Sequence, residues 1–85
     1  APTLTNLGGG QILVAWADNT NNEAGFRVQR ETKSGKRWIN TLIIADAAAD
    51  TTSITDAPGT GTFRYRVMAY NDADSAWSAW TEINN

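Results

Sequence analysis

The side chains best suited to chemistry in this sequence are aromatic and cationic, and they recur at short, regular spacings. Trp77 and Trp80 stand three positions apart in the segment Trp-Ser-Ala-Trp-Thr. A polyproline-type stretch has about three residues per turn, so this spacing places both indoles on one face. Arg64 and Arg66 alternate along another segment, and a guanidinium over an indole contributes about 0.5–1 kcal/mol at an exposed site. The sequence therefore predicts a ladder of Arg64, Arg66, Trp77 and Trp80, although ordinary packing of the two tryptophans would explain their spacing equally simply.

A second use of the aromatic side chains is contact with a carbohydrate or a protein. Sugars stack on flat rings, and the candidate members of such a platform are Trp38, Tyr70, Trp77 and Trp80. The alternative is that Trp38 covers the edge of a sheet and that the others belong to the ladder. A binding surface made from these rings is therefore a second hypothesis beside the ladder.

Side chains for metal binding and acid–base catalysis are scarce. The chain has no histidine and no cysteine, so it lacks the commonest general base, the commonest metal ligand and any thiolate. Asp18, Thr20 and Asn22 alternate as calcium ligands sometimes do, but only Glu23 adds a second carboxylate, and side chains of this kind usually bond their own backbone. We expect no metal, no cofactor and no enzymatic activity.

Gly8 to Gly10 is expected to form a turn rather than a phosphate-binding loop. The remaining carboxylates fall in predicted loops without a partner base, and their simplest role is solvated surface charge. This prediction covers Asp46, Asp50, Asp56, Asp72 and Asp74.

The totals describe one ordinary globular domain spanning residues 1–85. Hydrophobic residues make up 41% of the chain and charged residues 19%, which excludes a disordered composition. The net charge is −2 and the basic residues form no long run, so nucleic-acid binding is not expected. No apolar run approaches the roughly 20 residues of a membrane helix, and we expect no membrane insertion.

The clearest element is the segment Thr62–Tyr70, which alternates without a break between two sets of side chains. Phe63, Tyr65 and Val67 share one face, and a period of two with aromatic and β-branched residues is typical of a half-buried strand. Turn residues separate it from six further predicted strands, and the alanine-rich stretch 45–50 is too short for a helix and is expected to be a loop. The other strands are predicted at 1–6, 11–17, 25–31, 37–44, 51–55 and 76–83.

Seven short strands with frequent turn signals predict an all-β, seven-stranded antiparallel sandwich of the immunoglobulin-like kind. Truncation of the expected buried indole, Trp16→Ala, should cost about 3–5 kcal/mol. The predicted core consists of Leu4, Ile12, Val14, Trp16, Phe26, Val28, Leu42, Ile54, Tyr65 and Val67.

The order of these landmarks resembles a fibronectin type III domain over essentially the whole chain. The resemblance rests on Pro2 and Leu4 in the first strand, Trp16 closing the second, the Asn-rich run from Asp18 to Val28, and the later pattern of Tyr65 and Val67 with Ala69, Asn71, Ser75 and Ser78. Such Asn-rich loops are similar to those of bacterial extracellular proteins. The segment from Trp77 to Thr81 also resembles the tryptophan–serine box of class I cytokine receptors, but the cysteine-free chain suits the bacterial branch and we do not expect cytokine recognition.

The family usually carries a tyrosine at the start of the long strand, where this chain has Phe63. The resemblance therefore implies that the aromatic packing is kept and that the hydroxyl hydrogen bond, worth about 1 kcal/mol, is lost.

The resemblance implies a non-catalytic, secreted or cell-surface module with the fibronectin type III topology. We expect a monomer that spaces and orients neighbouring domains of a larger bacterial protein, such as a polysaccharide-degrading enzyme of the glycoside hydrolase kind. The alternative is a module that binds a polysaccharide or a protein through the tryptophans, or through the loops at 18–23 and 71–75.

Overall fold

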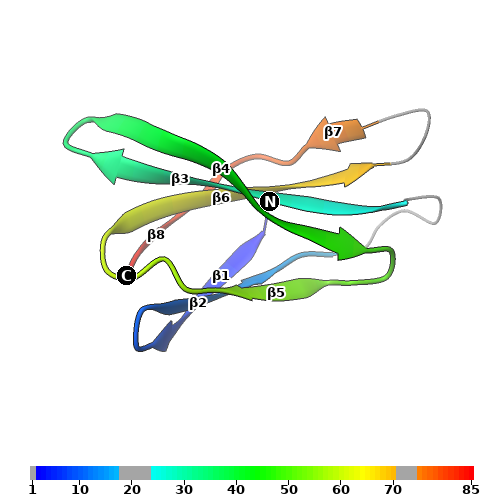
Figure 1. The fold of residues 1–85 in the computed structure, drawn as a ribbon, viewed down its shortest axis with the longest axis horizontal. Helices are drawn as coiled ribbons and strands as arrows, with labels where there is room; N and C mark the ends of the chain where they lie inside the picture. Colours follow the sequence, from blue (N-terminus) through cyan, green and yellow to red (C-terminus); the bar gives the residue numbers. More distant parts are fainter. Residues whose placement is uncertain (1, 18–23, 71–74) are drawn as a thin grey trace.

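The computed structural model shows two antiparallel sheets packed face to face (Figure 1), and it describes residues 2–17, 24–70 and 75–85. The smaller sheet has the order β1-β2-β5, and the larger has β4-β3-β6-β7, with β8 also paired to β6. This is the predicted antiparallel sandwich. The strands are β1 (Thr3–Gly8), β2 (Gln11–Ala15), β3 (Gly25–Ser34), β4 (Arg37–Ala48), β5 (Ser53–Asp56), β6 (Thr62–Tyr70), β7 (Ser75–Trp77) and β8 (Thr81–Asn84).

Strand β6 occupies the centre of the larger sheet, as its unbroken alternation predicts. Its residues Phe63 to Tyr70 pair with β3, and its other edge pairs first with β8 and then with β7. Because successive side chains of a strand point to opposite faces, one set of β6 residues reaches the interior and the other lies on the outer surface.

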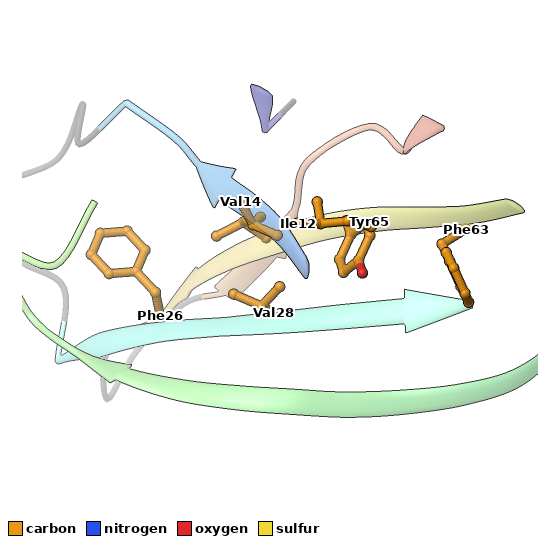
Figure 2. Packing of buried hydrophobic residues seen from close by; sticks show 7 residues of the cluster. Ile12, Val14, Phe26, Val28, Phe63 and Tyr65 are labelled. Carbon is orange, nitrogen blue, oxygen red and sulfur yellow. The ribbon is translucent and has the colours of Figure 1, made fainter. Parts of the chain in front are cut away.

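The interior is formed by alternating residues of the two facing sheets. Ile12 and Val14 of β2 are fully buried and meet Val28 of β3 and Tyr65 of β6 (Figure 2). Aliphatic and aromatic side chains of this size each contribute about 1.5–3 kcal/mol when fully buried. The buried cluster is Ile12, Val14, Phe26, Val28, Phe63, Tyr65 and Val67.

Four members of the predicted core need correction, because Leu42 is exposed and Leu4, Trp16 and Ile54 are only partly buried. Leu42 is 48% exposed, because it lies on β4, the edge strand of the larger sheet, where the smaller sheet does not cover it. Trp16 is only partly buried; it packs against the core with its ring 5.5 Å from that of Phe26. Phe63, which was expected to keep the aromatic packing without the hydroxyl, is 3% exposed and belongs to the buried cluster.

Two predicted element boundaries are also wrong. The stretch 45–50, expected to be a loop, continues β4 as far as Ala48, because Ala45 to Ala48 pair with Val28 to Gly25. Pairing with a neighbouring strand here outweighs the weak local preference of alanine. The single last strand expected at 76–83 is divided into β7 and β8, with residues 78–80 between them.

A polar group inside the sandwich joins the two sheets. Arg30 of β3 donates from Nη1 to Asp56 Oδ2 of β5 at 2.7 Å, and the Tyr65 hydroxyl donates to the same oxygen at 2.6 Å. Burial raises the pKa of Tyr65 above its ordinary range, and the hydrogen bond to Asp56 and its negative charge add to that effect. Asp56 was predicted to be a solvated loop carboxylate; it is instead 13% exposed at the end of a strand and paired with a cation.

Candidate functional site

The outer face of the larger sheet carries the candidate functional residues. Arg64 and Arg66 alternate with the buried residues of β6, so their side chains leave the sheet on the side away from the core. In the pairing of β3 with β6, Glu31 lies opposite Arg64 and Gln29 lies opposite Arg66. Four strands of one sheet therefore contribute to the site, because Trp38 comes from β4 and Trp77 from β7, and Trp80 lies in the segment after β7.

The aromatic and cationic side chains form a continuous series, called here the cation–aromatic ladder, made of Trp38, Arg64, Trp80, Arg66 and Trp77. The guanidinium carbon of Arg64 lies 4.5 Å from the Trp38 ring centroid and 4.4 Å from that of Trp80. Arg66 lies 4.4 Å from Trp80 and 4.5 Å from Trp77. Each of these distances is well inside the range of about 6 Å in which a cation is attracted to an aromatic face.

The structure thus places all four predicted ladder residues in one alternating series of contacts and adds Trp38 as a fifth member. Trp38 was singled out in the sequence for a sugar platform or a sheet edge. Trp38 and Arg64 both lie on the outer face of the sheet. The indole therefore reaches across β3, which separates β4 from β6, and contacts the guanidinium. Lys33 lies farther from the same ring, at 5.9 Å.

Two polar side chains of β3 hold the guanidinium groups in place. Arg64 donates from Nε to Glu31 Oε1 at 2.7 Å and from Nη2 to the same oxygen. Arg66 donates from Nε to the Gln29 side-chain oxygen at 2.6 Å. Since a guanidinium with fixed hydrogen bonds loses less freedom on stacking, these contacts favour the ladder geometry.

Glu31 is the buried charged residue of this face, at 9% exposure. Its second carboxylate oxygen accepts a hydrogen bond from the Thr41 hydroxyl of β4. That hydrogen bond, followed by the hydrogen bond and positive charge of Arg64 and the charge of Arg66, holds the pKa of Glu31 below its ordinary value against the opposing effect of burial. The carboxylate therefore stays ionised beneath the ladder.

The segment 78–80 is held on β6 by a serine rather than by a regular ladder of backbone hydrogen bonds. The Ser78 amide donates to the Val67 carbonyl at 2.8 Å, and the Val67 amide donates to the Ser78 hydroxyl at 3.0 Å. The hydroxyl itself donates to the Ala79 carbonyl. This local break in the strand turns Trp77 and Trp80 toward the two arginines of β6.

Tyr70 lies apart from the ladder. Its ring is 4.7 Å from the Arg27 guanidinium, which also pairs with Asp46 at 2.9 Å across the β3–β4 pair. Tyr70 pairs with Gly25, and a Cβ added at that glycine would stand 2.9 Å from the tyrosine hydroxyl. The missing side chain of Gly25 leaves room for the Tyr70 ring. The role of Tyr70 is therefore packing within the sheet. Asp46, expected in a loop, is a strand residue of β4 and is 62% exposed.

The four aromatic residues of the predicted carbohydrate or protein platform do lie on one sheet, but each is half-buried. Trp80 already contacts two guanidinium groups, and Trp38, Tyr70 and Trp77 each contact one. A sugar that stacked on Trp80 would compete with the arginines for the ring.

Other candidate sites receive little support. The segment 18–23, which was considered for calcium and not expected to bind it, and the carboxylates Asp72 and Asp74 lie outside the described residues. Within the described ranges, no three carboxylate side chains gather as a metal site would require. None of the described residues forms a helix with the length and apolarity needed to cross a membrane.

Sequence reasoning missed Glu31, Gln29 and Thr41 in this site. Glu31 and Gln29 alternate in the predicted strand 25–31, as Arg64 and Arg66 do in theirs, and that shared period was the available signal. It needs the pairing register to become useful, since only the register sets Glu31 opposite Arg64.

Comparison with known proteins supports the fold alone. A solved structure from a study of the computer-based redesign of a β-sandwich protein superposes with a TM-score of 0.73, at 20% sequence identity, over 99% of this chain and 88% of that one. No protein-family model matches the chain, and no curated protein matches it.

Proposed function

We propose that this chain is a non-catalytic module of the fibronectin type III class that spaces and orients neighbouring domains of a secreted or surface-exposed bacterial protein, such as a polysaccharide-degrading enzyme. The strand order and the sequence landmarks support the family. The observation that carries the spacer role is the cation–aromatic ladder, which fixes the last part of the chain on the central strand β6.

Contacts at the end of the last strand add to this argument. Asn85 and Gly61 exchange two backbone hydrogen bonds, at 2.7 and 3.1 Å, and the Asn85 side chain donates to the Gly59 carbonyl. Thr62 donates from its hydroxyl to Asn84 Oδ1 at 2.6 Å. A polypeptide that continued past Asn85 would leave the sandwich from a fixed point, which is what an orienting module needs.

The start of the chain is fixed in the same way at another place. Thr81 donates from its hydroxyl to the Pro2 carbonyl at 2.7 Å, so the beginning of β1 is held beside the beginning of β8. Figure 1 shows that the N-terminal end lies near the middle of the molecule and the C-terminal end at the side of the β3–β4 and β1–β2 turns. The two attachment points are therefore separated along the long direction of the sandwich.

A domain-exchange experiment in the parent protein tests this role. We expect that replacing residues 1–85 by an unrelated β-sandwich of similar length keeps the parent's activity on an insoluble polymer, whereas a flexible Gly/Ser linker of similar span lowers it. Activity on a small soluble substrate should be the same in both variants. Loss of activity with the unrelated sandwich would contradict a pure spacer.

The alternative, a binding module, predicts a different result in a simpler measurement. Titration with soluble chitin or cellulose oligomers should leave the tryptophan fluorescence unchanged if the ladder only stabilises the fold. A saturable change that Trp38→Ala removes, with the fold retained, would favour the carbohydrate platform.

A further inference from the structure

Strand β4 presents an open edge on the larger sheet. It stands at the end of the order β4-β3-β6-β7, and among the described residues β3 is its only paired strand. The backbone N–H and C=O groups on the far edge of such a strand can pair with another strand. At twelve residues, β4 is also the longest strand of the described chain.

The same strand carries most of the exposed large apolar side chains. Leu42 and Ile43 are each 48% exposed and Ile39 is 40% exposed. Of the described residues, only Leu7 of β1 is another exposed large hydrophobic, at 48%. A sheet edge that is both unpaired and apolar favours association with a further strand.

The charges along β4 indicate which strand fits there. Lys36 and Arg37 stand at its beginning and are exposed, whereas Asp46 lies near its end and Asp50 follows it in the next turn. When two copies of one strand pair antiparallel, the beginning of each lies beside the end of the other. Antiparallel self-pairing about Ile43 therefore brings Lys36 of one copy toward Asp50 of the other, whereas parallel pairing would set like charges together. Arg37 and Asp46 do not add to this match, because they pair with Ser34 and Arg27 on opposite faces of the sheet and Asp46 already contacts Arg27.

Two irregularities of β4 fall on either side of this apolar centre. The register with β3 shifts between Val28 and Gln29 and again between Arg30 and Thr32, and Asn40 has a φ of 56°. Ile44 on one side of Leu42 and Ile43, and Asn40 and Thr41 on the other side, therefore have no paired residue in β3. Bulges shorten the regular edge and limit strand addition, so an association at this edge should be weak.

We propose that β4 is a self-association edge, which pairs antiparallel with β4 of a second copy about a two-fold axis near Leu42 and Ile43. The pair covers the exposed leucine and isoleucines at the centre and matches basic with acidic residues at both ends. It joins two larger sheets into one and replaces the monomer expected from the sequence with a dimer that forms as the concentration rises.

The first test is sedimentation velocity of the 85-residue chain from about 5 µM to about 1 mM, since self-association follows mass action. We expect a concentration-dependent dimer, and Leu42→Lys should raise its dissociation constant at least about tenfold. The matched control is Leu7→Lys, which changes an equally exposed leucine on the other sheet and should dimerise as the unsubstituted chain does. Far-UV circular dichroism and a thermal melt check that both variants fold.

Charge reversal tests the antiparallel orientation separately. Lys36→Glu alone, or Asp50→Lys alone, sets like charges together across the two-fold axis and should weaken the dimer. The double variant Lys36→Glu with Asp50→Lys restores opposite charges and should recover it. A chain that stays monomeric over the whole range, equal weakening by Leu7→Lys and Leu42→Lys, or a double variant no tighter than the single variants would overturn the proposal.

Discussion

The two faces of β6 stabilise the molecule by different means. Phe63, Tyr65 and Val67 point inward, where the interior excludes water from their aliphatic and aromatic atoms. Arg64 and Arg66 point outward, where partly exposed guanidinium groups contact indole rings. The inner face depends on area removed from water, and the outer face depends on the geometry of a few charged contacts.

The difference shows most clearly in how each face treats a carboxylate. Inside, Asp56 accepts from Arg30 and Tyr65 and links two sheets. Outside, Glu31 accepts from Arg64 and Thr41 and links three strands of one sheet. The two carboxylates are about equally buried, at 13% and 12% side-chain exposure, but Arg30 is more buried than Arg64, at 17% against 26%, and Tyr65 is fully buried. We therefore expect substitutions on the inner face to cost more.

The largest effect should follow Asp56→Ala. The substitution leaves the Arg30 guanidinium without its counter-charge and the Tyr65 hydroxyl without its acceptor, and the loss of one partner of a buried pair costs about 3–5 kcal/mol. Urea denaturation measures the change in the free energy of unfolding. As a control, the triple variant Arg30→Met, Asp56→Leu and Tyr65→Phe, which removes all three polar groups together, should unfold close to the unsubstituted chain. A loss below about 1 kcal/mol for Asp56→Ala would show that the link between sheets is weak.

Arg64→Ala should have the next largest effect, a loss of about 2 kcal/mol. The guanidinium contacts two indoles and hydrogen-bonds a carboxylate, and its removal leaves Glu31 with only the Thr41 hydroxyl among these partners. Arg64→Lys, which keeps the charge but not the planar group, should recover only part of this loss. An unchanged melting temperature for Arg64→Ala would mean that the ladder does not stabilise the fold.

A smaller effect, present near neutral pH and disappearing in acid, should follow Glu31→Gln. Because the pKa of Glu31 is lowered in the folded state, its contribution to stability is present above the ordinary glutamate value of about 4.3 and is lost as the pH falls through the folded-state pKa. The variant should be less stable near pH 7 and should lose less on acidification. Thermal melts across the acid range measure this. Glu82→Gln, which removes an exposed carboxylate, should keep the acid sensitivity of the unsubstituted chain.

The smallest effect should come from Arg27→Ala, at about 0.5 kcal/mol or less. Arg27 also contacts an aromatic ring and a carboxylate, but its side chain is 46% exposed and that of Asp46 is 62% exposed. A thermal melt beside that of Arg64→Ala compares the same kind of residue in two surroundings. Equal losses for the two variants would show that the hydrogen-bonded, partly buried setting of Arg64 adds nothing.

The sequence predicted most of the fold because its strands alternate and its turns contain glycine, asparagine and aspartate. Thr62–Tyr70 was located with its full bounds, and it is the central strand β6. Alternation is a local signal, however, and it does not reveal how far a sheet is covered. Leu42 was assigned to the core from its type, and its exposure reflects the edge position of β4 and the bulges that change its register.

The ladder and the internal polar group differ in how far each could be predicted from the sequence. Trp77 and Trp80 are close along the chain, so their spacing could be compared with the alternation of Arg64 and Arg66. Arg30 and Asp56 come from different sheets and are 26 positions apart, and nothing in the local pattern of either residue indicates the other. Asp56 was consequently assigned to the surface from its loop-like neighbours.

The distribution of indoles between the two faces has a practical consequence for spectroscopy. Of the four tryptophans in the chain, three belong to the ladder and only Trp16 packs against the core. Intrinsic emission will therefore report mainly on the outer surface, while far-ultraviolet dichroism reports on the sheets themselves. A denaturation series in which the emission signal moves before the dichroism signal would record the arginines leaving their indoles while the sandwich is still closed.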